Sequence, residues 1–259
     1  MSLTKPQLEA IFVHSMMMVK EFHEVFGHPV GLETKSTLSE TRAVERGSYL
    51  FEELQEGLIA AIGKQKVKVV DAFADAVYFA CGNLIECGFP LHKANKILFD
   101  LLGDNDSALL SFAHIKEESD EYGWSRYTRN VFIGSLSEVS TQLLENLGGA
   151  NQEKDILVEN YSIELAFAFL AIMSVSLDVD PLAVMTEVHR SNMSKLLPAE
   201  LPDEDACRFY MAANGCPLPA IELKFERLDD GRWIAKNMGT NKVVKNPFYS
   251  EADLTALVS

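Results

Sequence analysis

Three glutamates crowd one stretch of the sequence, SYLFEELQEGLIAA at residues 48–61. The spacing of its apolar residues predicts an amphipathic helix. At 100° per residue, Glu52 and Glu56 lie about 40° apart and Glu53 lies about 60° from Glu56, so all three project from one face. Like charges at this spacing repel one another, and no basic residue follows one turn later. The face is therefore either solvated or a place where carboxylates gather around a cation.

Two aspartates on the next predicted helix favour the cation. Asp71 and Asp75 lie in VVDAFADAVYFACG, where nearly every neighbour is apolar. Burial of an uncompensated aspartate is costly, and aspartate is also a poor helix former. If the two helices form an antiparallel hairpin through GKQK, the five carboxylates meet at the same height. Oxygen ligands in this number suit a hard cation such as Mg²⁺ together with a polyphosphate, and they are more than one ion needs.

A di-iron centre is the alternative for a bundle of carboxylates. That chemistry expects Glu-x-x-His motifs on facing helices. None of the six histidines has a glutamate three positions before it. The sequence therefore favours a divalent cation of the Mg²⁺ type over iron.

Composition limits the partners of the protein. The 259 residues carry a net charge of −15, which argues against nucleic acid or an anionic membrane as the main partner. No apolar run reaches the ~18 residues of a membrane span. The N-terminus lacks the pattern of a signal peptide, and the four cysteines form no Cys-x-x-Cys pair. We therefore expect a cytoplasmic protein with reduced thiols.

A series of predicted helices must position the carboxylates. Apolar periodicity and stop signals such as FGHPVG predict helices at 3–26, 39–62, 67–86, from 91 onward, 129–147 and 159–188, the last of them broken by a turn at 178–181. The helix at 67–86 is apolar nearly all round, so we expect burial on most of its sides. The polar, acidic segment 104–123 is predicted to be a connector.

The second half of the chain resembles the first. An alignment that sets Glu53 against Glu138 sets Glu52 and Glu56 against Ser137 and Thr141. One interpretation is a diverged internal duplication in which the first copy alone kept its carboxylates. The other is a chance likeness between buried helices, and the sequence leaves both open.

The duplication divides the chain into a catalytic half (1–103), a connector (104–123), a degenerate second half (124–200) and a C-terminal extension (201–259). In the extension, AIELKFERLDDGRWIAKNM and NKVVKNPFY alternate apolar and polar residues around turn signals, which predicts short antiparallel strands. The expected fold is mostly α: a helical bundle built from a duplicated two-helix unit, with a small C-terminal β-hairpin.

Several motifs resemble those of the all-α nucleoside triphosphate pyrophosphohydrolases. These are the MazG-like and phosphoribosyl-ATP pyrophosphohydrolase-like proteins, which are related to dimeric dUTPases. The motifs are EELQE, DAFADAVYFACG, EVHRSNMSKL and the tail NKVVKNPFYSEADL. The resemblance covers residues 15–90, 155–197 and 240–254 and implies a MazG-like helical bundle.

The resemblance also implies roles for individual residues. Glu52 would position or activate a water molecule, and Mg²⁺ or Mn²⁺ would be held by Glu53, Glu56, Asp71 and Asp75. The commonest family pattern is Glu-x-x-Asp on the second helix, and Ala72 stands where that glutamate is expected. Asp71, one residue earlier, would have to take its place.

Asn192 and Lys195 match the Asn-x-x-Lys that contacts phosphates in the family. A triphosphate held among carboxylates also needs a cation and an amide donor on physical grounds. The alternative is an ordinary basic helix C-terminus. Lys242 and Tyr249 in the tail are further substrate-binding candidates, for which a basic surface hairpin is the alternative.

His23 and His28 flank the stop signal of the first predicted helix. An ordinary capped helix end explains them better than contact with a base.

The first functional hypothesis is a Mg²⁺-dependent pyrophosphohydrolase. Water would attack a (deoxy)nucleoside triphosphate between its α and β phosphates and give a monophosphate and pyrophosphate. The alternatives are a phosphoribosyl-ATP pyrophosphohydrolase of histidine biosynthesis and a non-catalytic nucleotide- or metal-binding scaffold. The base, the sugar and the oligomeric state, including a homodimer, stay open.

Overall fold

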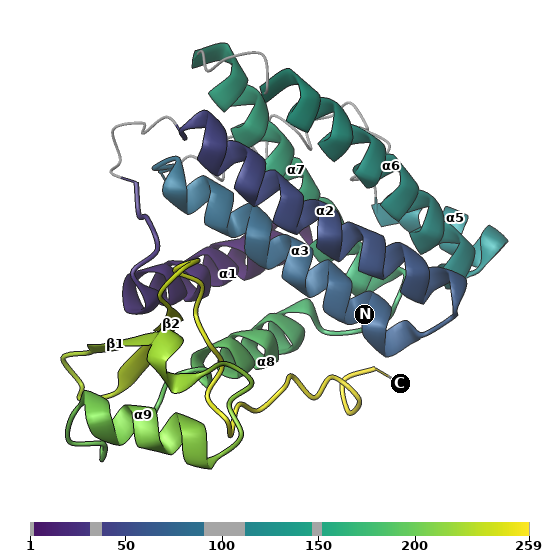
Figure 1. The fold of residues 1–259 in the computed structure, drawn as a ribbon. Helices are drawn as coiled ribbons and strands as arrows, with labels where there is room; N and C mark the ends of the chain where they lie inside the picture. Colours follow the sequence, from purple (N-terminus) through teal and green to yellow (C-terminus); the bar gives the residue numbers. More distant parts are fainter. Residues whose placement is uncertain (1–2, 32–37, 91–111, 147–151, 259) are drawn as a thin grey trace.

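The computed structural model describes residues 3–31, 38–90, 112–146 and 152–258, and most of them are helical (Figure 1). Two short antiparallel strands, β1 (Leu223–Arg227) and β2 (Trp233–Asn237), follow a 3₁₀ turn at Ala220–Glu222. The predicted class, mostly α with a small C-terminal hairpin, is confirmed. The helices are α1 (Lys5–Phe26), α2 (Glu40–Ile62), α3 (Lys66–Glu86), α5 (Phe112–Tyr122), α6 (Trp124–Asn146), α7 (Gln152–Val175), α8 (Pro181–Met193) and α9 (Glu204–Ala213).

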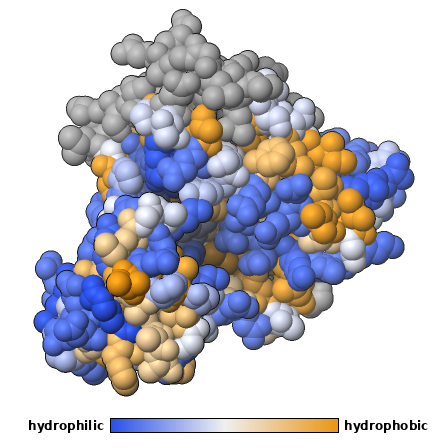
Figure 2. All heavy atoms as spheres, viewed as in Figure 1, coloured by the Kyte–Doolittle hydropathy of each residue, from blue (hydrophilic) through white to orange (hydrophobic). Residues whose placement is uncertain are grey.

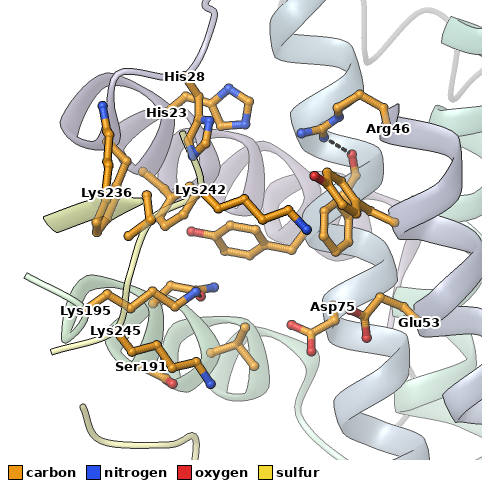
Figure 3. A pocket seen from close by; sticks show the side chains of 18 of the residues that line it. His23, His28, Arg46, Glu53, Asp75, Ser191, Lys195, Lys236, Lys242 and Lys245 are labelled. Atoms are coloured by element: carbon orange, nitrogen blue, oxygen red, sulfur yellow. Dashed lines mark hydrogen bonds between the residues drawn. The ribbon is translucent and has the colours of Figure 1, made fainter. Parts of the chain in front are cut away.

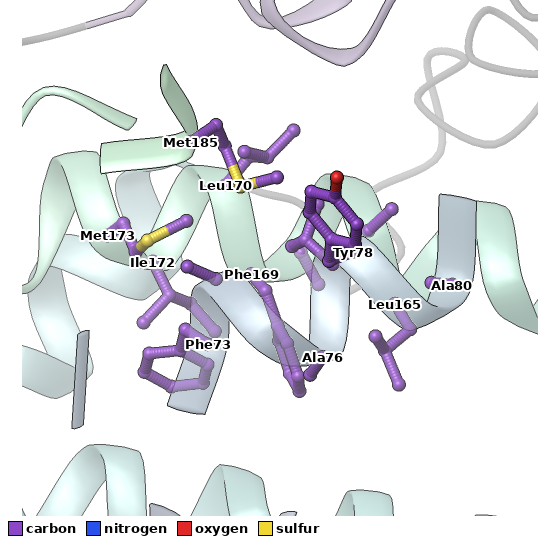
Figure 4. Packing of buried hydrophobic residues seen from close by; sticks show 14 of the residues in the cluster. Phe73, Ala76, Tyr78, Ala80, Leu165, Phe169, Leu170, Ile172, Met173 and Met185 are labelled. Atoms are coloured by element: carbon purple, nitrogen blue, oxygen red, sulfur yellow. The ribbon is translucent and has the colours of Figure 1, made fainter. Parts of the chain in front are cut away.

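Helix α3 lies at the centre of the bundle. It packs against α2 and α7 and also contacts α1 and α8. Most of its residues from Val69 onward are buried, as the all-round apolar pattern predicts. Phe73 packs edge-on against Phe169 of α7, with ring centroids 4.6 Å apart (Figure 4). The two aspartates of α3 therefore sit on a helix that has little freedom to move.

Helix α7 contains a long run of apolar residues. Its residues from Leu165 to Met173 are all buried in the main core. Within the described ranges, no helix combines the length and the apolar character needed to cross a membrane.

Helices α2 and α3 each run along a partner from the second half. Helix α2 packs against α6, as α3 packs against α7. A Cβ on Gly57 of α2 would lie only 2.3 Å from the Phe132 ring of α6, so a larger residue would push these helices apart. Phe132 in turn stacks on Phe73 with ring centroids 4.5 Å apart. This pairing is what a duplicated two-helix unit would give; the duplication and the domain boundaries stay predictions.

The ends of the first three helices agree closely with the predicted ends. Helices α2 and α3 match the predicted ranges 39–62 and 67–86 to within one residue. Helix α1 ends at Gly27, whose φ of 66° places it in the left-handed region that favours glycine. The chain then turns back, and the backbone N–H of Gly31 donates to the carbonyl of Ile85 over 2.9 Å. This turn brings residues 28–31 beside the end of α3.

Other elements differ from the prediction. Part of the predicted connector forms α5, because Ile115 is fully buried against the core. Helix α9 is not predicted by the sequence, and the predicted strand in NKVVKNPFY is wrong. Only an isolated bridge joins Val243 to Lys236, and the backbone then turns toward α8, where the N–H of Asn246 donates to the carbonyl of Lys195. The predicted helix from residue 91 lies outside the described residues.

Residues 197–246 form a unit that we call the C-terminal module, at the lower left of Figure 1. It has a small hydrophobic cluster of its own, in which Trp233 of the hairpin and Met211 of α9 are buried. The backbones of Leu197 and Trp233 exchange two hydrogen bonds of 2.8 and 3.2 Å. These bonds attach the hairpin to the chain just after α8.

Candidate active site

A cavity of about 990 Å³ opens between the helical bundle and the C-terminal module. Its walls come from the end of α1, from α2, α3, α8 and β2, and from residues 240–252. The space-filling view shows the surface hollowed between these two parts of the molecule (Figure 2). Most of the residues predicted to bind metal or substrate line this one cavity.

One side of the cavity is acidic, and we call Glu53, Asp71 and Asp75 the acid wall. Burial and the charge of Asp75 raise the pKa of Glu53 to about 8. Burial and the charge of Asp71 raise the pKa of Asp75 to about 7. The pKa of Asp71 is raised by burial and by Glu56. The three carboxyl groups are therefore partly desolvated and lie in a cluster of carboxylates that repel one another.

Glu52 and Glu56 occupy different positions from Glu53. Both side chains are exposed, and neither is among the residues that line the cavity. Their charges nevertheless contribute to the raised pKa of Glu53, so they lie near the acid wall. The structure thus gathers the five predicted carboxylates in one region but places two of them on its outer side.

The opposite side of the cavity is basic, and we call Lys195, Lys242 and Lys245 the lysine wall. Lys195 and Lys245 extend toward Asp75 and Glu53 across the cavity (Figure 3). Desolvation lowers the pKa of Lys195 to about 8, and its ammonium donates to the side-chain oxygen of Asn192. The charges of Lys195 and Lys245 both act to lower the pKa of Asp75. The two walls are therefore electrostatically coupled.

Helix α8 and the segment 241–252 are held together by hydrogen bonds. The hydroxyls of Tyr249 and Ser191 lie 2.8 Å apart, and the N–H of Ser250 donates to Ser194 Oγ over 3.0 Å. The side-chain amide of Asn246 donates to the carbonyl of Leu196 over 2.7 Å. Tyr249 thus fixes the tail on α8 and lines the cavity, and Lys242 and Lys245 are carried into the cavity with it.

An ion cluster stands at the far end of α2 and α3. The Glu86 carboxylate is buried and accepts two hydrogen bonds from Arg42, of 2.6 and 2.8 Å. Arg46 lies 3.2 Å from the same carboxylate and donates to Asn83 and to the carbonyl of Phe79, each over 2.7 Å. Both arginines line the cavity. Their hydrogen bonds join α2 to α3.

Two histidines close the same end of the cavity. The ring of His28 stacks on Phe22 with centroids 5.5 Å apart. Burial lowers the pKa of His28 to about 4 and also lowers that of His23, so both rings are neutral at pH 7. His23 Nδ1 lies 2.9 Å from the carbonyl oxygen of Pro29, which can only accept, so Nδ1 carries the ring proton. These histidines belong to a capped helix end, as predicted, and they line the cavity as well.

The acid wall can be tested for its fit to a cation. Among the side chains that the structure describes, no three of His, Cys, Asp or Glu already converge as a preformed metal site. The donor set nevertheless fits Mg²⁺ or Mn²⁺, since it offers oxygen alone and its members repel one another. A bound cation would remove that repulsion.

Several residues of the cavity were not predicted from the sequence. Glu251 of the tail lines the cavity and raises the pKa of Asp71. Tyr49, Phe79 and Lys236 also line it. Tyr49 precedes Glu53 by one helical turn and Phe79 follows Asp75 by one turn, so helical spacing could have identified them. No signal in the sequence places Glu251 beside Asp71.

Comparison with known proteins relates the part of the chain that carries the carboxylates to one family. Residues 19–99 match the family model described as phosphoribosyl-ATP pyrophosphohydrolase, a range that contains all five carboxylates. The chain is 22% identical over 255 residues to "Uncharacterized protein L479" of Acanthamoeba polyphaga mimivirus, covering 93% of this chain and 94% of that protein. No solved structure matches the chain at a significant level. Residues 19–99 are thus a phosphoribosyl-ATP pyrophosphohydrolase-type domain of the MazG-like, all-α NTP pyrophosphohydrolase superfamily.

Proposed function

We propose that this protein is a Mg²⁺-dependent pyrophosphohydrolase that cleaves a (deoxy)nucleoside triphosphate into a monophosphate and pyrophosphate. The observation that carries the proposal is the pair of facing walls. Glu53 and Asp75 face Lys195 and Lys245 across one cavity (Figure 3). A polyphosphate needs cations on both of its sides, and this cavity offers lysines on one side and carboxylates suited to a divalent ion on the other.

Each wall has its own task in the proposed reaction. Glu53, Asp71 and Asp75 would hold the ion, with Glu56 as a further ligand from the outer side. When bound, Mg²⁺ supplies charge neutralisation to the phosphoryl oxygens and activation to water. Lys195 stabilises negative charge on the phosphates, and Asn192 fixes the direction of its ammonium through their hydrogen bond.

Glu52 is the proposed residue that positions or activates the attacking water. Its exposed side chain is free to accept a proton and pass it to solvent. Tyr249 and Lys242 of the tail would contact the substrate from the side opposite α3. Tyr249 already bonds Ser191 through its hydroxyl, so it acts through the position of the tail as well.

Product analysis tests the reaction. The purified protein is incubated with Mg²⁺ and each of a panel of NTPs and dNTPs, and the products are separated by ion-exchange chromatography. We expect a monophosphate and pyrophosphate in equal amounts, and no turnover once the ion is removed with EDTA. Release of orthophosphate would contradict the proposal, as would inactivity with every nucleotide.

A second candidate substrate comes from the description of the matching family model, which names phosphoribosyl-ATP. The same panel includes this compound, and a strong preference for it over all NTPs and dNTPs would assign the histidine pathway instead. Tight nucleotide binding without any product would indicate the non-catalytic scaffold.

A further inference from the structure

The cavity has a second end, which begins one helical turn from the acid wall. The antiparallel packing of α2 and α3 sets their residues level with one another. Tyr49 lies level with Phe79, with ring centroids 5.8 Å apart, and Arg42 lies level with Glu86. Along α2, the carboxylate of Glu53 is followed first by the ring of Tyr49 and then by the arginines of the ion cluster. The backbone distance from Glu53 to these arginines is roughly 10 Å or more.

The chemistry changes along this direction. The arginines at the far end are already engaged within the protein: every guanidinium nitrogen of Arg42 and Arg46 lies within 3.2 Å of a protein oxygen. Glu45 and Glu86 balance their charge. This end therefore attracts phosphates less than the lysine wall does, because within the part of the chain that the structure describes Lys242 and Lys245 form no ion pair. Lys245 lies over the ring of Tyr249, and Lys242 lies over Tyr49, where the two ends of the cavity meet.

The surfaces at the far end suit a flat, uncharged ring. Phe22, Tyr49 and Phe79 present aromatic surface to the cavity. His28 adds a neutral imidazole, which offers one hydrogen-bond donor and one acceptor. Aromatic faces stack on nucleobases, and a neutral donor and acceptor can pair with a base edge. Tyr49 and Phe79 lie one helical turn, about 6 Å along the helix, from the acid wall, which is comparable with the distance from the α-phosphate of a nucleotide to its base.

We infer that this compartment, formed by Phe22, His28, Tyr49 and Phe79, binds the nucleobase of the substrate and that His28 contributes to base selection. The nucleotide then lies along the groove between α2 and α3, with its phosphates between the acid and lysine walls. The inference rests on the proposed function and adds the direction of the substrate and the residues that contact its base.

Gly82 supports the compartment from beneath. A Cβ at this position would lie 2.2 Å from a guanidinium nitrogen of Arg46 and 3.0 Å from His23 Nε2. Glycine therefore lets Arg46 and His23 pack directly on α3, which keeps their side chains out of the space that the base would fill. Arg46 and His23 are positioning residues for the compartment.

Base discrimination tests the inference. The ratio of kcat/KM between the best and the worst nucleotide of the panel is measured for the wild type, for His28→Ala and for His28→Asn. We expect His28→Ala to compress this ratio by roughly tenfold, the effect of about one lost hydrogen bond with a base. His28→Asn, which keeps a donor and an acceptor, should retain part of the ratio. His14→Ala is the matched control, since His14 is an exposed histidine of α1, the helix that ends two residues before His28.

Binding of substrate fragments separates the two ends of the cavity. By calorimetry, Tyr49→Ala should weaken binding of a nucleoside monophosphate by roughly tenfold or more and leave binding of inorganic tripolyphosphate unchanged. Lys245→Ala, which removes an ammonium beside Tyr249 and not beside Tyr49, should weaken binding of tripolyphosphate. Equal loss of kcat/KM for all bases in His28→Ala, or equal loss of both fragments in Tyr49→Ala, would overturn the inference. Monophosphate binding needs no turnover, so it tests the compartment even if the proposed hydrolysis fails.

Discussion

Helices α2 and α3 hold different kinds of side chain from helices α6 and α7, which pack against them. Helices α2 and α3 place Glu53, Asp71 and Asp75 in a cavity where burial, and after it the repulsion from neighbouring carboxylates, raises the pKa of each carboxyl group. Helices α6 and α7 bury aromatic and aliphatic residues, and Thr141 bonds back to the carbonyl of Ser137 in its own helix. One pair thus stores unfavourable charge that a ligand can relieve, and the other supplies apolar burial that holds the first pair in place.

The largest expected effect is on activity, and it is tested by replacing one glutamate on α2 and one on α6. Glu53→Gln removes a proposed metal ligand and should lower kcat by about 10³-fold, with the fold intact by circular dichroism. Glu138→Gln, the matching position of α6, should stay within about twofold of the wild type. Similar losses in both variants would mean that the second pair carries part of a working site.

The second effect concerns the supporting pair. Phe132→Ala removes a fully buried ring that packs on Phe73 and against Gly57. We expect the free energy of unfolding to fall by about 3–5 kcal/mol, measured by urea denaturation. Ile133→Ala is the control. The side chain of Ile133, the next residue, is 51% exposed, so its removal should change the free energy of unfolding by less than about 1 kcal/mol. A small loss in Phe132→Ala would show that α6 does not support the site.

The third prediction is a gain in stability. In EDTA, Asp75→Asn should raise the free energy of unfolding at pH 7.5 by about 1–2 kcal/mol, because it removes a carboxylate whose charge the fold disfavours. Mg²⁺ should stabilise the wild type and have less effect on the variant. Glu117→Gln on α5, an exposed position, should stay within about 0.5 kcal/mol. A destabilised Asp75→Asn would show that Asp75 has a structural partner.

The smallest effect is the pH dependence of that gain. Folding raises the pKa of Asp75 from its ordinary value near 3.8 to about 7. Its penalty is therefore present above the folded pKa and shrinks as the pH falls through 7 toward 4. Without metal, the stability advantage of Asp75→Asn should decline between pH 8 and pH 5, as followed by urea denaturation at each pH. An advantage that is constant over this range would contradict the raised pKa.

The carboxylates and the helices that carry them could be predicted because helical spacing and apolar neighbours are local in the sequence. Asp71 and Asp75 stood out because nothing in their surroundings compensated their charge. The tail could not be predicted: alternation in NKVVKNPFY indicates a strand, but its backbone bonds to the end of α8 instead. The compartment at Tyr49 and Phe79 was missed because a single aromatic residue on a helix is usually part of the core.

The docking of residues 241–252 on α8 has a consequence for the time at which the site comes into being. Every helix of the bundle is translated before this segment, and domains generally fold in step with synthesis from the N-terminal side. The bundle, with its acid wall, can therefore form while one side of the cavity is still open. Lys242, Lys245 and Tyr249 arrive last, so a nascent chain has the carboxylates of the acid wall before it has the lysines that face them.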